Sequence, residues 1–212
     1  MRFTFEQMDA AARFEFMTAT VVPRPIAIIT TLDAQGRVNA APYSFFGLLA
    51  VSPPLLGIGV LPHAEGRMKD TGANVLARGE LVANMVSETM AEAMNLTCID
   101  APPGMDEAAL AQLETTPSDS VAPPRLAASP VAFECRLHQA IQFGPAEAIL
   151  LVRILAAHVG DALVGLAPAH VVDTPGLHLF GAMHAARWYA RTGDLFAMDR
   201  PNWRDWSSGR TI

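Results

Sequence analysis

The sequence predicts one mainly β domain, a barrel to which helices are added. Its 212 residues suffice for a single domain with a substantial core, and we expect residues 1–212 to form that domain. Six or seven segments have the composition and periodicity of strands. They follow one another through short connections, with a few helical patterns between them. This order of elements favours a barrel that carries helices.

The first sixty residues predict a helix and three strands. A helical pattern covers Phe5–Phe16, and the two prolines within Val22–Pro25 then force an extended path. β-branched residues, a turn around Gly36 and the prolines of Ser52–Pro54 mark where the strands begin and end. The three strands expected here are Pro25–Thr31, Val38–Phe46 and Leu55–Leu61.

The rest of the chain mixes short helices with strands. A helix over Gly72–Arg78 follows Asp70 and Thr71, either of which can cap it. Residues 100–130 form a long excursion with one helix, Asp106–Leu113, and such insertions usually lie on the surface or over a site. The other expected elements are a helix at Ser87–Leu96, strands at Glu80–Val86, Val131–His138 and Ala148–Val159, and strand-like segments after Gly176.

Charge and hydropathy exclude two classes of partner. The formal net charge of −6 leaves no basic field for a nucleic-acid backbone, so no nucleic acid is expected. The longest uncharged span, Val38–Ala64, contains prolines that cost about 3 kcal/mol each inside a helix, so we expect strands there and no membrane span. Charged residues between Arg2 and Glu15 precede any apolar run, which argues against a signal peptide and for a cytoplasmic protein.

The apolar content points to self-association. Hydrophobic residues make up 51% of the chain and charged residues only 17%, which is low for a small monomeric protein. We therefore expect the span Val38–Ala64 to contribute to a dimer interface. Cys98 and Cys135 have no partner spacing, so two buried thiols are expected, with neither a disulfide nor a metal site.

The segment Arg67–Thr71 is a candidate anion site. Among 15 basic residues only Lys69 is a lysine, and it lies beside Arg67, Asp70 and Thr71 just before a predicted helix. A guanidinium, an ammonium, a hydroxyl and the free N–H groups of a helix start together suit a phosphate. The alternative is a solvated turn that only caps the helix.

A second candidate is the strand end Asn39–Phe46. Small residues allow a planar ligand to approach the backbone, Pro42 leaves a carbonyl unpaired at a strand edge, and Ser44 offers a hydroxyl. The alternative is ordinary packing of small and aromatic side chains at the end of a strand.

Taken in order, the motifs of this chain resemble those of a known family. The matching residues are Arg24–Ala27, Thr30–Thr31, Asn39–Phe46, Pro53–Pro54, Lys69–Thr71 with Asn74, Val82–Val86, Met94–Asn95, and the tail Trp188–Thr192 and Asp194–Phe196 to Arg200–Pro201. The chain is similar to the flavin reductase-like proteins of the FMN-binding split barrel superfamily over roughly residues 20 to 202. The resemblance implies a split β-barrel of Greek-key type, a homodimer, and FMN at or near the subunit interface.

The resemblance also implies a set of site residues. Arg67, Lys69 and Thr71 match the loop that grips the flavin phosphate, and Asp70 orders that loop. The strand Ala41–Phe45 lies along the flavin ring and directs backbone N–H groups at its polar edge. The complete set of expected cofactor-binding residues is Arg24, Thr30, Asn39, Ala41, Pro42, Tyr43, Ser44, Phe45, Arg67, Lys69, Asp70, Thr71 and Asn84.

The activity that the resemblance implies is an NAD(P)H-dependent flavin reductase, in which NADH or NADPH delivers hydride to flavin N5. FMN is favoured over FAD because the loop offers groups for one phosphate and no second nest for a pyrophosphate. An oxygenase component that receives the reduced flavin is a further expected partner. Two alternatives remain, a non-catalytic FMN-binding electron carrier and a flavin-dependent oxygenase acting on a small organic substrate.

The C-terminal motif departs from the family pattern. Many relatives carry an arginine where this chain has Ala182, so any flavin or nicotinamide contact made by that arginine is absent here unless Arg187 replaces it. His184 is the one candidate for a catalytic side chain, and its alternative is a histidine satisfied by local hydrogen bonds.

Overall fold

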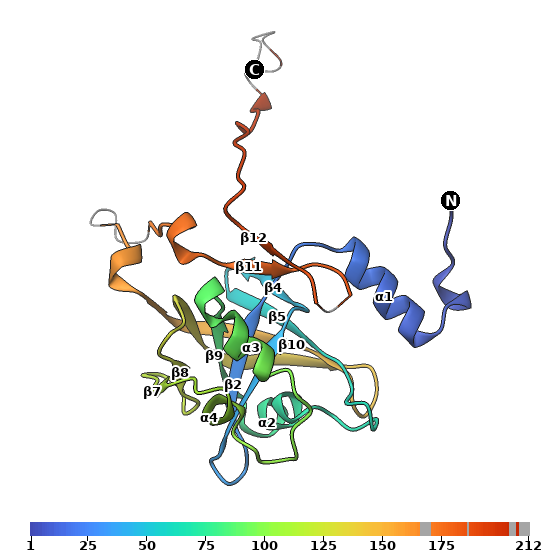
Figure 1. The fold of residues 1–212 in the computed structure, drawn as a ribbon, viewed down its shortest axis with the longest axis vertical. Coiled ribbons are helices and arrows are strands. Elements are labelled where there is room, and N and C mark those ends of the chain that lie inside the picture. Colours follow the sequence, from blue (N-terminus) through green and yellow to red (C-terminus); the bar gives the residue numbers. More distant parts are fainter. Residues whose placement is uncertain (166–170, 186, 204–206, 208–212) are drawn as a thin grey trace.

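A seven-stranded antiparallel sheet forms the centre of the computed structural model, which describes residues 1–165, 171–185, 187–203 and 207 (Figure 1). The strand order is β3-β2-β6-β9-β10-β5-β4. The strands are β2 (Ala27–Leu32), β3 (Val38–Tyr43), β4 (Phe46–Val51), β5 (Pro54–Val60), β6 (Glu80–Met85), β9 (Val131–Gln142) and β10 (Ala148–Val159). The connection from β5 to β6 passes over the β9–β10 hairpin, as in a Greek key.

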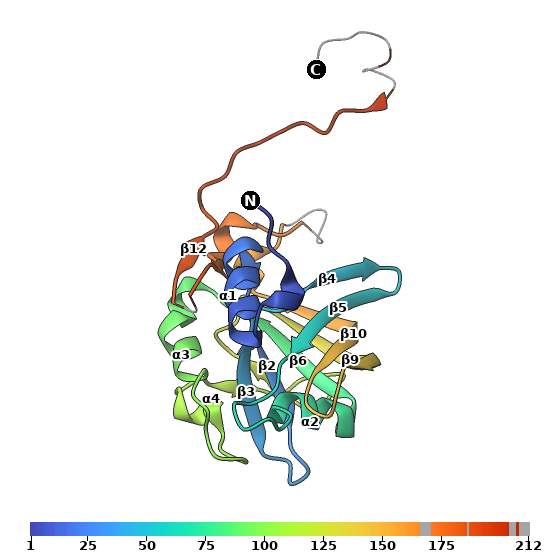
Figure 2. The same cartoon turned by 90° about the vertical axis from the view of Figure 1, so that its right-hand side faces the viewer.

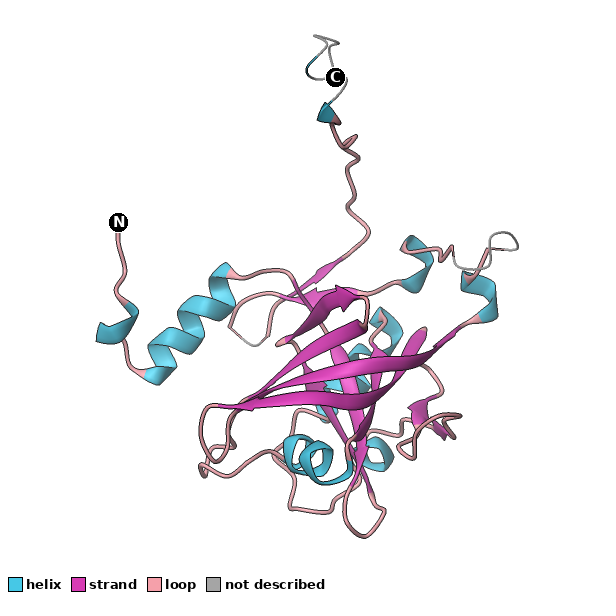
Figure 3. Ribbon diagram, turned by 180° about the vertical axis from the view of Figure 1, so that it is seen from behind, coloured by secondary structure: helices cyan, strands magenta, loops and turns pink. Residues whose placement is uncertain are grey.

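The two edge strands of this sheet, β3 and β4, are consecutive in the chain. Only Ser44 and Phe45 separate them, so the edges meet although no ladder joins them. The sheet therefore curls into a barrel that is open along one seam (Figure 3). Its interior is filled by buried apolar side chains, among them Ile29, Ile58 and Leu150. This confirms the mainly β split barrel predicted from the sequence.

Helices and small sheets surround the barrel. The helices are α1 (Ala10–Thr20), α2 (Asp70–Arg78), α3 (Ala91–Leu96) and α4 (Glu107–Leu110), with 3-10 turns at Phe5–Gln7, Glu88–Met90, Asp161–Leu163 and Pro175–Leu177. A three-stranded sheet joins β1 (Arg24–Pro25), β11 (Phe180–Ala182) and β12 (Tyr189–Arg191), and β7 (Thr115–Thr116) pairs with β8 (Arg125–Leu126). None of the helices in the described residues is long and apolar enough to cross a membrane.

Most elements lie where the sequence predicts them, and three predictions need correction. The uncharged span contains an additional strand, β4, directly after the predicted return strand. The first helix begins at Ala10 rather than Phe5, because the side chain of Asp9 accepts a hydrogen bond from the Ala12 N–H and caps it. Lys69, and not Asp70 or Thr71, stands at the cap position of α2, and no side chain bonds to the N–H groups there.

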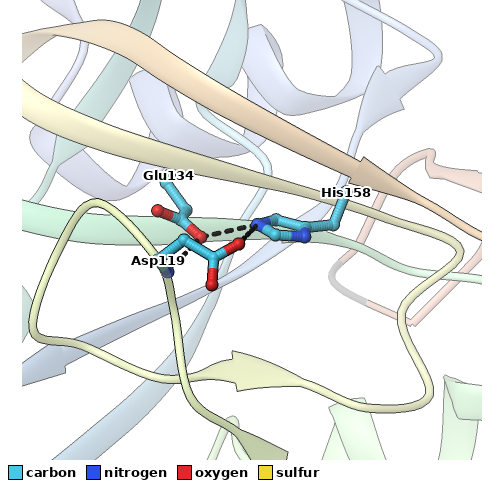
Figure 4. Close-up of side chains that lie close together, drawn as sticks. All are labelled: Asp119, Glu134 and His158. Carbon is cyan, nitrogen blue, oxygen red and sulfur yellow. Dashed lines mark hydrogen bonds and ion pairs between the residues drawn. The ribbon is translucent and has the colours of Figure 1, made fainter.

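The excursion over residues 100–130 is fastened to the barrel through a buried carboxylate. Glu134 on β9 is fully buried and accepts hydrogen bonds from the Asp119 and Ser120 N–H groups. His158 on β10 contacts the same carboxylate, Nε2 to Oε1 2.6 Å, and its Nε2 lies 3.6 Å from Asp119 Oδ2 (Figure 4). These three side chains come close enough to hold a metal ion, but the short Nε2–Oε1 distance is that of a hydrogen bond.

Candidate functional site

Two adjoining cavities lie at the open seam of the barrel. The first has a volume of about 300 Å³ and the second about 170 Å³. Pro42, Tyr43, Lys69 and Cys98 line both, so the two cavities are neighbours that share a wall. The strand end Asn39–Phe46 and the loop before α2, predicted as separate candidates, thus meet at one site.

The first cavity has a mainly apolar wall with a few polar groups, which is the usual character of a site for a small organic ligand. Its wall comes from α1, the β3–β4 connection, β5, α3 and the β11–β12 hairpin. The apolar and aromatic lining residues are Phe14, Ile26, Pro42, Tyr43, Phe45, Leu61, Met94, Ala182, Met183, Trp188 and Tyr189. Acidic residues are absent from the described lining of this cavity.

The second cavity opens onto the start of α2. The first hydrogen bond of α2 runs from the Ala73 N–H to the Lys69 carbonyl. The N–H groups of residues 70–72 therefore have no acceptor within the helix. Asp70 and Thr71 line the cavity at this end. A nine-residue helix with an uncapped start presents free donors and the positive end of its dipole to a bound anion.

Two cations stand at the same end of the second cavity. Arg67 donates from Nη1 to Asp70 Oδ1 at 2.6 Å, an ion pair that holds the loop ahead of α2. Lys69 forms no ion pair within the part of the chain that the structure describes, and it lines both cavities. The sequence-based expectation that Asp70 orders this loop agrees with its pairing to Arg67.

Hydroxyl and imidazole groups complete the set of donors. Tyr43 is buried, and its hydroxyl forms no hydrogen bond of regular geometry, although the Thr71 side chain lies beside it. Burial raises the pKa of Tyr43 to about 12, so the phenol keeps its proton at neutral pH. Thr71 accepts a hydrogen bond from the Asn39 amide at 2.9 Å, which leaves its own O–H free to donate. His63 pairs through Nε2 with Asp100 at 3.2 Å.

Carboxylates limit what the second cavity can hold. Asp70, Asp100 and Glu107 line it together with the cations. Glu107 is buried and accepts a hydrogen bond from the Ala40 N–H at 3.0 Å. Burial, with Asp70 and Asp106 nearby, raises the pKa of Glu107 despite that bond. The lining of the second cavity thus combines cations with carboxylates that already have partners.

The outer edge of β3 offers fewer amide donors than expected from the sequence. The Ala40 N–H points away from β2, because it donates to Glu107. Strand alternation then directs the nitrogen of Pro42, which carries no hydrogen, to that same side, and β3 ends at Tyr43. Neither Ala40 nor Pro42 therefore offers a free N–H at this edge.

Arg24 contributes a buried cation to the first cavity. Its Nη1 donates to the Thr18 and Val21 carbonyls, and its Nη2 donates to the Met183 carbonyl at 2.7 Å. These bonds tie the end of α1 to β11. Burial lowers the pKa of Arg24. An arginine side chain nevertheless stays protonated in proteins, so the wall of the cavity carries a positive charge.

The structure brings together eleven of the thirteen residues expected to bind a cofactor. They are Arg24, Asn39, Ala41, Pro42, Tyr43, Ser44, Phe45, Arg67, Lys69, Asp70 and Thr71. Thr30 and Asn84 are the exceptions: both are fully buried, and the Asn84 amide donates to Thr30 Oγ1. Neither residue lines either cavity, because their side chains lie inside the sheet and hold β2 to β6.

The catalytic candidate His184 lies outside both cavities. It is exposed and stacks on Trp188, with ring centroids 6.1 Å apart. The sequence-based interpretation missed Cys98, His63 and Trp188 as lining residues, although Trp188 belongs to the tail motif. Cys98 is exposed rather than buried, which corrects the expectation for that thiol.

The residues present fit a flavin that carries one phosphate. The first cavity supplies an apolar slot of the size and character that a planar ring needs. The second supplies an uncapped helix start, Lys69 and Arg67, and the unpartnered Tyr43 hydroxyl lies between the two. A buried hydroxyl without a partner is costly unless a ligand or water completes it.

Comparison with known proteins identifies the domain family. The model of the flavin reductase like domain matches residues 18–185. The Pseudomonas fluorescens 2-nitrobenzoate 2-nitroreductase NbaA superposes with a TM-score of 0.86 and 30% identity, covering 96% of this chain and 98% of that one. Nitrilotriacetate monooxygenase component B from Bacillus cereus gives 0.86 and 28%, with 93% and 98% covered.

A more distant structure bears on the fold alone. A Shewanella frigidimarina protein described with a split barrel domain superposes with a TM-score of 0.79 at 18% identity, covering 95% of this chain and 100% of that chain. Its barrel corresponds to the sheet that is open between β3 and β4 here.

Proposed function

The chain belongs to the flavin reductase like domain family, and on this premise we propose that it is an NAD(P)H-dependent flavin reductase that binds FMN. The observation that carries the proposal is the junction of the two cavities. An apolar slot adjoins a phosphate-sized cavity at a helix start, and Tyr43 and Lys69 line both. That is the shape of a ligand with a planar ring at one end and an anion at the other.

The second cavity is proposed to hold the FMN phosphate. Lys69 and the N–H groups at the start of α2 neutralise and orient the anion, and Thr71 offers its hydroxyl. Arg67 holds the loop through Asp70 while its remaining N–H groups face the same anion. The nearby carboxylates of Asp100 and Glu107 disfavour the second phosphate of FAD.

The first cavity is proposed to hold the flavin ring. Bound flavin supplies the hydride-accepting chemistry, so the protein needs only to bind and orient it and to exclude water. Met94, Phe45 and Trp188 exclude water from the slot, and the Ser44 amide and Arg24 guanidinium offer polar contacts. None of the described lining residues forms a nucleophile–base pair, in keeping with chemistry that resides in the cofactor.

Flavin binding is the first test of this proposal. The purified protein should be yellow or bind FMN, and mass spectrometry of the released cofactor should identify FMN. Titration with FMN, riboflavin and FAD should rank FMN first, because only FMN matches both cavities without a second phosphate. A protein that binds none of the three has a different function.

Turnover separates the reductase from its alternatives. Oxidation of NADH or NADPH in the presence of FMN supports the reductase. Retained flavin without oxidation of either nucleotide supports an electron carrier. Oxygen consumption that depends on an added organic substrate supports the oxygenase.

A homodimer and an oxygenase component are the proposed partners. Leu48 and Val51 are 68% and 82% exposed on a hairpin that projects from the barrel (Figure 2). Apolar side chains at that exposure favour burial against a second copy. The Bacillus cereus neighbour is a component of a monooxygenase, and by analogy this chain supplies reduced flavin to an oxygenase component. Co-purification and transfer assays with candidate oxygenases test that partner.

A further inference from the structure

Arg24 is a buried cation without a neutralising carboxylate. The residue is 9% exposed, and its three hydrogen bonds run to backbone carbonyls of Thr18, Val21 and Met183. Its Nε is buried and has no partner. Among the described residues no Asp or Glu forms an ion pair with it. A guanidinium in this state is expensive to bury unless negative charge reaches it from elsewhere.

The charge lining of the two cavities is unequal. The second cavity combines Arg67 and Lys69 with the carboxylates of Asp70, Asp100 and Glu107. The first cavity has two cations, Arg24 and Lys69, and no carboxylate in its described lining. In a chain with a net charge of −6, this excess of positive charge is local to the slot. A low-dielectric wall strengthens its field on whatever the slot holds.

The position of Arg24 in the fold is fixed. It lies on β1 and pairs in register with Ala182 on β11, whose small side chain leaves the guanidinium room beside the cavity. The bond from Nη2 to the carbonyl of Met183, the residue directly after β11, holds the guanidinium there. Lys69, by contrast, also lines the second cavity, where the phosphate is proposed to bind.

We propose that the positive charge of Arg24 makes the first cavity bind a negatively charged flavin ring preferentially, so that the cavity binds reduced flavin more tightly than oxidised flavin. This inference rests on the proposed function. Oxidised flavin has a neutral ring, whereas uptake of two electrons and one proton leaves a negative charge on it. A fixed cation stabilises that charge without moving a proton, and it raises the reduction potential of the bound cofactor.

The test compares reduction potentials of the bound flavin in wild type, Arg24→Gln and Arg24→Lys. Riboflavin is measured as well as FMN. Because riboflavin has no phosphate, its potential does not depend on contacts in the second cavity. Loss of a charge-assisted hydrogen bond costs roughly 1.5–3 kcal/mol. Arg24→Gln should therefore lower the reduced-to-oxidised affinity ratio about ten- to hundredfold. Each tenfold loss lowers the two-electron potential by about 30 mV.

The other proteins in the experiment define its controls. Arg24→Lys keeps a charge and should remain nearer to wild type than Arg24→Gln. Arg153→Gln removes an exposed arginine on β10 that lines neither cavity, and it should leave the potential unchanged. Circular dichroism and thermal unfolding establish that each variant folds.

Two results overturn the inference while the proposed function stands. One is an unchanged potential in Arg24→Gln. The other is an equal loss of affinity for oxidised and reduced flavin, which would make Arg24 a structural residue only. If Arg24→Gln does not fold, the proposal is tested on the wild type. Riboflavin bound to the wild type must then have a higher reduction potential than free riboflavin. A wild type that binds no flavin overturns the proposed function and this inference together.

Discussion

Lys69, the one lysine of the chain, lies where both cavities meet. Its contribution to FMN affinity can be measured separately from that of the flavin ring. Lys69→Gln removes a charge-assisted contact to the proposed phosphate, so FMN affinity should fall about ten- to hundredfold. Riboflavin affinity should change little, because riboflavin lacks the phosphate. Fluorescence titration with both ligands measures the difference. Equal losses for the two ligands would place the anion elsewhere.

The two cysteines should differ in reactivity. Burial raises the pKa of the Cys135 thiol to about 12, and Cys135 has no exposed surface. Burial also raises the pKa of Cys98, Lys69 opposes that rise, and Cys98 is exposed at the shared wall of the cavities. Iodoacetamide at pH 8 should modify Cys98 alone in the folded protein, and bound FMN should slow the reaction. Peptide mass spectrometry identifies the site, and equal labelling with and without FMN would contradict the proposed position of the flavin.

Glu134 links the stability of the protein to pH. Burial alone would raise the pKa of Glu134, but the hydrogen bonds from Asp119, Ser120 and His158 outweigh it and hold the pKa below its ordinary value. The carboxylate thus contributes stability above the unfolded-state pKa of about 4.3, and this contribution is lost as pH falls through the lower folded-state pKa.

The matched variant for that linkage is Glu134→Gln. It should lower the free energy of unfolding at pH 7 by about 2 kcal/mol, because hydrogen bonds to a charged acceptor are replaced by weaker ones. Urea unfolding from pH 7 to pH 3 measures both proteins. The difference between them should shrink below about pH 4, and a difference that is constant with pH would rule out this role.

Among the elements, β11 depends on close approach to β1. A Cβ at Gly181 would lie 3.0 Å from Pro23 Cβ and 3.1 Å from the Arg24 carbonyl oxygen, both tighter than most contacts of a Cβ atom. Gly181→Val should therefore push β1 and β11 apart, displace Arg24 and weaken flavin binding. Gly144→Ala, in an open turn with no atoms near the added Cβ, is the matched control. Retained flavin affinity in Gly181→Val would show that the wall tolerates the shift.

The same elements show which features can be predicted from sequence. Strands β2, β5, β6, β9 and β10 are marked by local composition and by turn residues, and they lie close to their predicted bounds. Strand β4 was missed because only Ser44 and Phe45 separate it from β3, without a charge, a glycine or a proline at the boundary.

Some residues of the site could likewise be predicted from the sequence, and others could not. The Arg67–Thr71 cluster was predictable because its members are neighbours in sequence. Other lining residues come from separate segments of the chain that lie together only in the folded protein, namely His63, Cys98 and Trp188. Thr30 and Asn84 were expected at the site but line neither cavity, because the resemblance gives a strand without showing which of its side chains face the interior.

At the scale of the whole molecule, the projecting β4–β5 hairpin is the proposed dimer interface. Leu48, Leu49 and Val51 are all exposed there, and Leu49 also lies close to Gly57 across the hairpin. We expect a dimer in solution for the wild type and a monomer for Leu48→Asp combined with Val51→Asp. Light scattering at micromolar concentration measures the mass. Ala34→Asp, in an exposed turn, is the control charge substitution, and a wild type that is monomeric would contradict the proposed dimer.

The two edges of the sheet differ in their tendency toward strand addition, the route by which exposed edges cause aggregation. At β3, proline removes one outward donor and Glu107 occupies the next, so an incoming strand would find no continuous row of partners. Strand β4 has no such block on its outer side in the described chain. Backbone pairing between copies would therefore take place at β4, and the edge beside the cavities is kept free for a small molecule.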